Sequence, residues 1–196
     1  MSDAHDLAAA RERLQRFLAP ECTERLFVQA TGHPAQDTGF CYCDHSLLST
    51  LRVWIRGALF TIVLMLPFNE LKLRVLRWCG ARIGRHVYLS ESVWIDPVFP
   101  HLLTIEDEVL IGFGARIFFH EFRRDEFRAG RVILRSGSFV GGLAVLACGV
   151  EIGRNATVSA AAVVGKDVPE GHVAIGNPAR VLHGSSKEID GAIVAD

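Results

Sequence analysis

Three groups of residues in this sequence have the types and spacing that chemistry needs. His120, in the segment IFFHEF, carries an imidazole, which exchanges protons near neutral pH and is a candidate general base. Asp96, in DPVFP, could bind a substrate hydroxyl or the His120 ring, or it could simply start the turn before Pro97. The cluster CYCDH (residues 41–45) supplies only half of a zinc site, so we interpret it as ordinary reduced thiols.

A six-residue period predicts the scaffold that positions these groups. A helix would repeat at about 3.6 residues and a single strand at about 2, so a period of six indicates short strands joined by tight turns. With three such units per coil, the sequence predicts a three-sided parallel β-helix of about four coils. The twelve repeating positions are all Leu, Ile or Val: Ile83, Leu89, Ile95, Ile105, Ile111, Ile117, Leu134, Val140, Leu146, Ile152, Val158 and Val164.

Two insertions interrupt the period, after Ile95 and after Ile117. Both follow the third unit of a coil, so we expect both loops to leave the prism at one corner. Neighbouring coils stack about 4.8 Å apart, which would bring Asp96 beside His120. The partner that orients the His120 ring could then be Asp96, Glu121 or a backbone carbonyl.

The first 80 residues read as mostly helical. Helices are expected from about Ser2 to Pro20, from about 46 to 66, and from Pro67 to a C-terminal cap at Gly80; residues 30–45 read as loop. We therefore divide the chain into a helical segment (1–80), a β-helix (81–183) and a tail (184–196). The apolar residues 54–68 are expected to cover the open end of the solenoid, and contact with a membrane surface is the less favoured alternative.

Composition narrows the function classes. The chain has 196 residues, with 21 Lys and Arg against 22 Asp and Glu, which argues against a duplex nucleic-acid binder. Five cysteines, an odd number, and the lack of a secretory signal pattern favour a cytoplasmic protein. The uncharged stretch 57–69 is shorter than the roughly 18 residues that a membrane-spanning helix needs.

The repeats, followed by VVGKDVPEG (163–171) and IGNPARVL (175–182), resemble the hexapeptide-repeat acyltransferases, and most closely the maltose and galactoside O-acetyltransferase branch. That resemblance implies a mainly β fold, a left-handed parallel β-helix, and a homotrimer that binds acetyl-CoA between subunits, with no metal. His120 stands where this family carries its catalytic histidine, just before an extended loop. It would act as general base for acyl transfer to a hydroxyl of a sugar or another small acceptor, which Asp96 and Glu121 would help to bind.

The same resemblance implies a cofactor path. Small residues at Gly141, Gly142, Ala160 and Ala161 would let the pantetheine arm approach the backbone. Gly165 would also bind the cofactor, and Lys166 and Arg180 would meet its phosphates. The chain departs from the family at Phe139, where a Trp is usual, and at residues 160–162, where hydroxyl side chains are replaced by Ala.

Two other functions use the same scaffold. A carbonic anhydrase needs two zinc-binding histidines a few residues apart, and the histidines at 86, 101, 120, 172 and 183 contain no such pair, so we discount it. A non-catalytic binding or structural solenoid, in which His120 has no role, is the second alternative. A turnover assay on a His120→Ala variant separates it from the enzyme.

Overall fold

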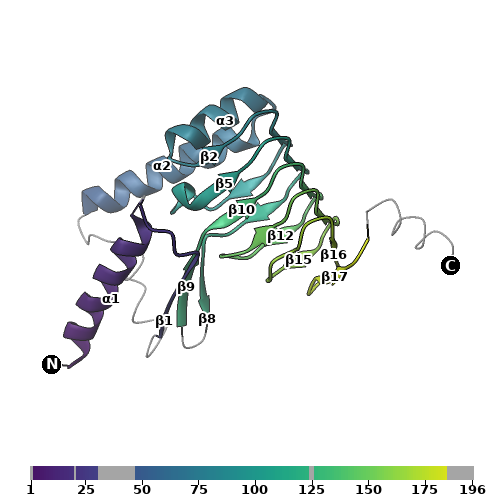
Figure 1. Cartoon of the computed structure of the whole chain (residues 1–196). Coiled ribbons are helices and arrows are strands. Elements are labelled where there is room, and N and C mark those ends of the chain that lie inside the picture. Colours follow the sequence, from purple (N-terminus) through teal and green to yellow (C-terminus); the bar gives the residue numbers. More distant parts are fainter. Residues whose placement is uncertain (1, 20, 31–46, 124–125, 185–196) are drawn as a thin grey trace.

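Short strands stack into three parallel sheets that form the faces of a prism (Figure 1). The computed structural model describes residues 2–19, 21–30, 47–123 and 126–184. From β2 to β15, the strands of the coils lie on the first, second and third face in turn, as a six-residue repeat predicts.

The first face holds β2 (Arg82–Ile83), β5 (Leu103–Ile105), β10 (Val132–Leu134) and β13 (Glu151–Ile152). The second holds β3 (Tyr88–Leu89), β6 (Leu110–Ile111), β11 (Phe139–Val140), β14 (Thr157–Val158) and β16 (Val173–Ile175), edged by the antiparallel β17 (Arg180–Leu182). The third holds β4 (Trp94–Ile95), β7 (Arg116–Ile117), β12 (Val145–Leu146) and β15 (Val163–Val164).

The repeating aliphatic positions form the core of the prism. On the third face, Ile117 pairs in register with Ile95 on one side and with Leu146 on the other. Eleven of the twelve predicted positions are at most 2 % exposed, and Ile83 is half-buried. Burying one such side chain contributes about 1.5 to 3 kcal/mol. The six-residue period therefore reflects aliphatic columns that run along the prism axis, and the predicted β-helix is confirmed.

Helices α2 (Leu47–Met65) and α3 (Asn69–Trp78) cover the N-terminal end of the prism, whereas α1 (Ser2–Leu18) lies beside the strand at residues 26–30 (Figure 1). Gly80 ends α3 as predicted: its φ is +92°, its N–H donates to Arg77 O, and Ala81 N donates to Leu76 O at 3.0 Å. These are the paired bonds of a Schellman cap. Within the described residues, no helix is both long and apolar enough to span a bilayer.

The sequence did not predict the three strands β1 (Leu26–Ala30), β8 (His120–Arg123) and β9 (Glu126–Gly130). β1 lies in the segment expected to be helical and pairs antiparallel with β9. The insertion expected as a loop at 121–131 is instead mostly a hairpin of β8 and β9. The three strands form a small sheet in the order β1-β9-β8. Helix α1 packs against this sheet through the contact of Phe17 with Phe27. Residues 1–80 are therefore joined to the β-helix by a shared sheet. The expected loop at 31–45, the CYCDH cluster and nearly all of the tail lie outside the described residues.

Candidate active site

Both insertions leave the prism where the third face turns into the first. The first insertion follows Asp96, which comes directly after β4, and contains the short 3-10 helix η1 (Pro100–Leu102). The second follows β7 and opens with Phe118, Phe119 and His120. β4 and β7 are hydrogen-bonded neighbours, so the two insertions start side by side, as their positions in the repeat predict. We call this place the His120 corner.

Asp96 is the partner of the His120 ring. Nδ1 of His120 lies 2.5 Å from Oδ2 of Asp96, and the Asp96 side chain has no exposed surface. The same carboxylate accepts hydrogen bonds from Val98 N at 2.9 Å and Phe119 N at 3.2 Å. A carboxylate in this setting accepts hydrogen bonds, so Nδ1 carries the proton and Nε2 presents a lone pair. Of the three partners left open by the sequence, the geometry selects Asp96.

Burial changes the interpretation of Asp96. The sequence left two roles open for it, binding an acceptor hydroxyl or binding the His120 ring. Because the carboxylate has zero exposed surface and already accepts three hydrogen bonds, its geometry fits orientation of the ring. The two backbone donors fix the carboxylate, and the carboxylate fixes the imidazole.

Aromatic rings surround the imidazole. The Phe99 ring meets it edge-on with centroids 5.7 Å apart, and the rings of Phe122 and Phe127 lie 6.3 Å away. Phe99 comes from the first insertion, and the other two come from the hairpin. The His120 side chain remains 18 % exposed, so one edge of the ring is accessible to a ligand. Sequence analysis did not identify these phenylalanines; their only signal was their place inside the two insertions.

Glu121 points toward the arginines of the hairpin. Its carboxylate accepts a hydrogen bond from Arg123 at 2.9 Å, and the side chain is 29 % exposed. In the hairpin it pairs across from Arg128. Glu121 is adjacent to the accessible ring of His120 in the chain and keeps some exposed surface, so a role in holding an acceptor stays a prediction.

The small residues expected along the cofactor path lie at the opposite edge of the third face. Gly141 and Gly142 form the turn between β11 and β12, and Ala160 and Ala161 form the equivalent turn of the next coil. The two turns are in close contact: a Cβ atom added to Gly141 would lie 2.5 Å from Ala160 N. Ala160 and Ala161 are exposed. The third face is therefore bordered by small residues on one side and by the His120 corner on the other.

The residues expected near phosphates lie toward the C-terminal end of this face. Gly165 and Lys166 follow β15 on the His120 corner, and both are exposed. Arg180 begins β17, opposite Ile175. Ala179 N donates to Val163 O at 2.9 Å, which ties the turn before Arg180 to β15. Lys166 and Arg180 thus both lie toward the C-terminal end of the prism, Lys166 after the third face and Arg180 on the strand that edges the second.

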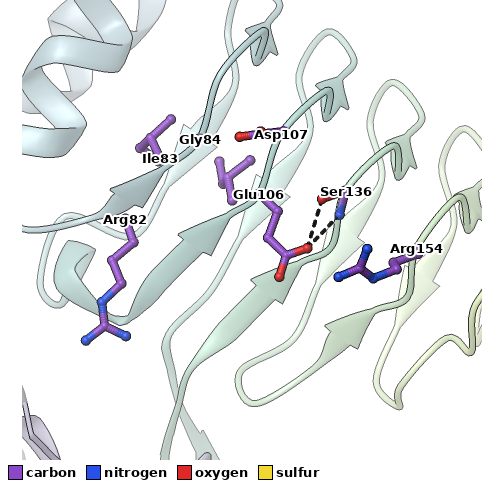
Figure 2. Close-up of a pocket in the computed structure, with 8 residues that line it drawn as sticks. Arg82, Ile83, Gly84, Glu106, Asp107, Ser136 and Arg154 are labelled. Atoms are coloured by element: carbon purple, nitrogen blue, oxygen red, sulfur yellow. Dashed lines mark hydrogen bonds between the residues drawn. The ribbon is translucent and has the colours of Figure 1, made fainter.

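A second hollow lies away from the His120 corner. It measures about 470 Å³ and opens on the first face between Arg82 and Arg154 (Figure 2). Figure 2 shows the Glu106 carboxylate inside it, bonded to Ser136 through the backbone N–H at 2.9 Å and the hydroxyl at 3.0 Å. Arg135 holds the same carboxylate at 2.8 Å, and this hydrogen bond is the largest cause that lowers the pKa of Glu106. The two carboxylates that line this hollow are already paired, Glu106 with Ser136 and Arg135 and Asp107 with Arg85, so it fits a structural role.

Among the described side chains, no group of three His, Cys, Asp or Glu is arranged to hold a metal ion. One pair of histidines was not predicted: Nδ1 of His183 lies 3.0 Å from Nε2 of His172. The pair lies where β16 meets β17, at the end of the prism opposite the helices.

Comparison with known proteins agrees with this geometry. No family model matches the chain. Over 152 residues it is 28 % identical to "Putative acetyltransferase YvoF" of Bacillus subtilis (strain 168), covering 77 % of this chain and 88 % of that protein. It is 32 % identical over 107 residues to a galactoside O-acetyltransferase of Escherichia coli (strain K12), covering 51 % of this chain and 52 % of that one. The chain thus spans about half the length of the second relative.

A solved structure gives the fold. The hexapeptide-repeat acetyltransferase VCA0836 of Vibrio cholerae O1 biovar eltor, complexed with acetyl-CoA, superposes with a TM-score of 0.59 at 22 % identity. The match covers 72 % of this chain and 91 % of that one. The fold is therefore the left-handed β-helix of hexapeptide-repeat proteins, and the predicted resemblance to acetyltransferases is confirmed.

Proposed function

We propose that this chain, which resembles the hexapeptide-repeat acetyltransferases of the maltose and galactoside branch, is a CoA-dependent O-acetyltransferase with His120 as its general base. Its relatives are named as acetyltransferases, and a structural neighbour was solved with acetyl-CoA. The observation that carries the proposal is the hydrogen bond between His120 and the buried Asp96. It supports a base whose tautomer and direction are fixed before any substrate arrives.

In the proposed reaction, Nε2 of His120 removes the proton of an acceptor hydroxyl. Acetyl-CoA, as co-substrate, supplies the thioester carbonyl that the hydroxyl oxygen attacks, with release of the CoA thiolate. Asp96 remains an acceptor throughout and stabilises the imidazolium that forms. The proton held on Nε2 then passes to the leaving thiolate, which returns His120 to its starting state. Phe99 and Phe127 exclude water from one side of the ring, which strengthens the contact with Asp96.

The third face fits the co-substrate. We propose that the pantetheine arm passes Gly141, Gly142, Ala160 and Ala161. A ligand can reach the half-buried Gly142 and the two exposed alanines, whereas Gly141 is buried and leaves room for Ala160 of the next coil. Across the third face, on the His120 corner, Gly165 is exposed, and an added Cβ there would meet no atom within 4 Å. The phosphates would lie nearest two exposed cations, Lys166 and Arg180. In a homotrimer, a neighbouring subunit would close this face into a groove.

A direct transfer fits this site better than an acyl-thiol intermediate. Cys148 lies in the turn after β12, at the same corner as His120. Burial, the largest cause, raises the pKa of its thiol to about 12. The thiolate is the nucleophilic form, so at neutral pH Cys148 is a poor acyl acceptor.

The test of the proposal is release of CoA from acetyl-CoA in the presence of a panel of sugars and other small alcohols, followed with a thiol reagent. Wild type is expected to release CoA only when an acceptor is added, and His120→Ala is expected to lose the acceptor-dependent rate. Equal rates in the two proteins would remove His120 from the mechanism. Absence of turnover with every acceptor, together with no binding of CoA by calorimetry, would favour the non-catalytic solenoid.

The cytoplasm is the compartment we propose, on the odd number of cysteines. The near-neutral charge, 21 basic against 22 acidic residues, supports small molecules over nucleic acid as ligands.

A further inference from the structure

Helix α2 presents apolar side chains on two opposite sides. Phe60 and Leu64 are at most 4 % exposed and point into the protein. The other side carries a stripe that is at least half exposed: Leu51, Trp54, Ile55, Ile62 and Met65. At about 100° per residue, these five positions fall within roughly 100° of the helix circumference. A helix that only covered the end of the solenoid would need the first side and not the second.

Helix α3 carries a second exposed apolar stripe, which includes a cation. Leu71 and Trp78 are 40 % and 82 % exposed, and Phe68, just before the helix, is 64 % exposed. Arg74 falls between Leu71 and Trp78 on the same side of the helix and is exposed. The two helices contact each other and lie together at one end of the prism (Figure 1). We call the two exposed stripes the α2–α3 face.

The segment that carries this face is rich in basic residues. From 47 to 85 the sequence has seven Lys and Arg against a single acid, Glu70, although the whole chain is nearly neutral. Among the described side chains, Arg74 and Arg77 of α3 are exposed, whereas Lys72 is buried and Arg85 pairs with Asp107. Arg77 donates to the carbonyl oxygens of Ile83 and Gly84, and neither partner carries a charge. Cations beside exposed tryptophans are the combination that binds anionic headgroups and the interface beneath them.

A cavity of about 450 Å³ opens within the same face. One wall is α2 from Trp54 to Ile62, and the other is Pro97 and Val98. The hydroxyl of Thr61 donates to Gly57 O at 2.9 Å, so the polar side chain of the lining is already satisfied. A cavity of this size and chemistry fits a hydrocarbon chain better than a sugar.

We propose that the α2–α3 face docks on an anionic lipid bilayer, with Trp54 and Trp78 at the interface and Arg74 at the headgroups. The cavity beneath α2 would accept part of an acyl chain. Docking of this kind lies on the membrane and does not cross it, in keeping with the lack of a spanning helix among the described residues. The cavity wall at Pro97 and Val98 belongs to the first insertion of the His120 corner, but none of the residues proposed to hold CoA lies on this face.

The first experiment is co-sedimentation of the full chain with vesicles of phosphatidylcholine, alone or mixed with phosphatidylglycerol. Binding is expected to be stronger to the anionic vesicles and to weaken with salt. Arg74→Ser should reduce it about fivefold, and the double variant Trp54→Ala/Trp78→Ala more than about tenfold. The matched controls are Arg154→Ser and Leu182→Ala, exposed residues of the same kinds at the far part of the prism, which should bind as wild type does.

The second experiment asks how deep the tryptophans lie. The chain has three Trp, so in a Trp94→Phe background only Trp54 and Trp78 fluoresce. Phosphatidylglycerol with brominated acyl chains is expected to quench them, and free bromide is not. Both tryptophans are mostly exposed, so thermal melting of the double variant should match that of wild type.

Three results would overturn the proposal. They are no sedimentation with anionic vesicles, equal sedimentation with neutral ones, or binding that survives in the double variant. A fall in solution mass when both tryptophans are replaced would show instead that a second copy of the chain covers this face.

Discussion

Nδ1 of His120 lies 2.5 Å from a carboxylate oxygen of Asp96, although 24 residues separate them in the chain. The β-helix creates this contact by stacking the ends of β4 and β7. Asp96 is held in turn by two backbone N–H groups. The proposed base is therefore positioned by backbone geometry, and each component of the arrangement can be tested.

Asp96→Asn should lower kcat for acetyl transfer about 10- to 1,000-fold and leave KM for acetyl-CoA near its wild-type value. Asn can donate a hydrogen bond to Nδ1, which favours the tautomer with the proton on Nε2. Because the proposed base needs a free lone pair on Nε2, this tautomer cannot accept the substrate proton. The measurement is steady-state kinetics as a function of pH. As a control, Glu126→Gln in the same hairpin should keep most of kcat, because Glu126 pairs with Arg128 and does not hold the ring. A normal kcat in Asp96→Asn would contradict the orienting role.

Cys148→Ala should keep the wild-type rate of acetyl transfer, because a thiol whose pKa is raised to about 12 is almost fully protonated at pH 8. For the same reason, iodoacetamide should label Cys148 far more slowly than a free peptide thiol, as measured by peptide mass spectrometry over time. An acetylated Cys148 peptide, trapped by acid quench during turnover, would contradict direct transfer.

Ser138→Ala should stabilise the protein by about 1 kcal/mol in urea unfolding. Ser138 is 1 % exposed, and its hydroxyl lacks a hydrogen-bond partner among the described residues. Removing a buried, unsatisfied hydroxyl recovers part of its desolvation cost. Ser136→Ala is the matched control and should destabilise, since the Ser136 hydroxyl bonds Glu106 at 3.0 Å. A loss of stability in Ser138→Ala would show that the hydroxyl is satisfied.

Lys72→Met should destabilise the protein by about 1 to 3 kcal/mol, and the loss should grow at alkaline pH. Lys72 is 1 % exposed and donates to the carbonyl oxygens of Leu89 and Ser90, which Met would leave unpaired. Desolvation lowers the pKa of Lys72 in the folded protein.

The sign of this pH dependence follows from the direction of the shift. Between the lowered folded pKa and the ordinary value near 10.5, the unfolded chain binds the proton and the folded protein does not, so the stability of wild type rises with pH. Lys72→Met lacks this gain. Urea unfolding of both proteins at several pH values up to about 10 measures the difference, and parallel curves would contradict it.

Sequence alone predicted the β-helix because every six-residue repeat must bury one aliphatic side chain in the same column. Each aliphatic position, such as Ile117, must stack between equivalents like Ile95 and Leu146, so residue type and spacing carry the information directly. The shared corner of Asp96 and His120 was predicted by counting repeats, because both insertions follow the third repeat of a coil. β1 did not, because Leu26 finds its partner Gly130 across more than a hundred residues, and nothing local in its sequence marks that pairing.

Within the site, the sequence left three partners for His120 because the choice depends on side-chain direction at a turn, and the period does not encode it. The rings of Phe99 and Phe127 were missed for a related reason: they lie in insertions, where no repeat constrains the backbone. The exposed stripe of α2 was also hidden. An apolar helix predicts burial, and only the structure separates Phe60, which is covered, from Trp54, which is not.

The pairing of β1 with β9 also sets the order in which parts of the structure can form during synthesis. Leu26 is synthesised roughly a hundred residues before Gly130, its partner in the sheet. Until β9 emerges, β1 has no edge to join, and the hairpin that begins at His120 is unsupported on that side. The coils can wind locally as they appear, whereas the small sheet beside His120 must close a loop of roughly a hundred residues. The His120 corner is therefore completed only after the two coils of β2 to β7 have been synthesised, and before the coils that begin with β10 and β13.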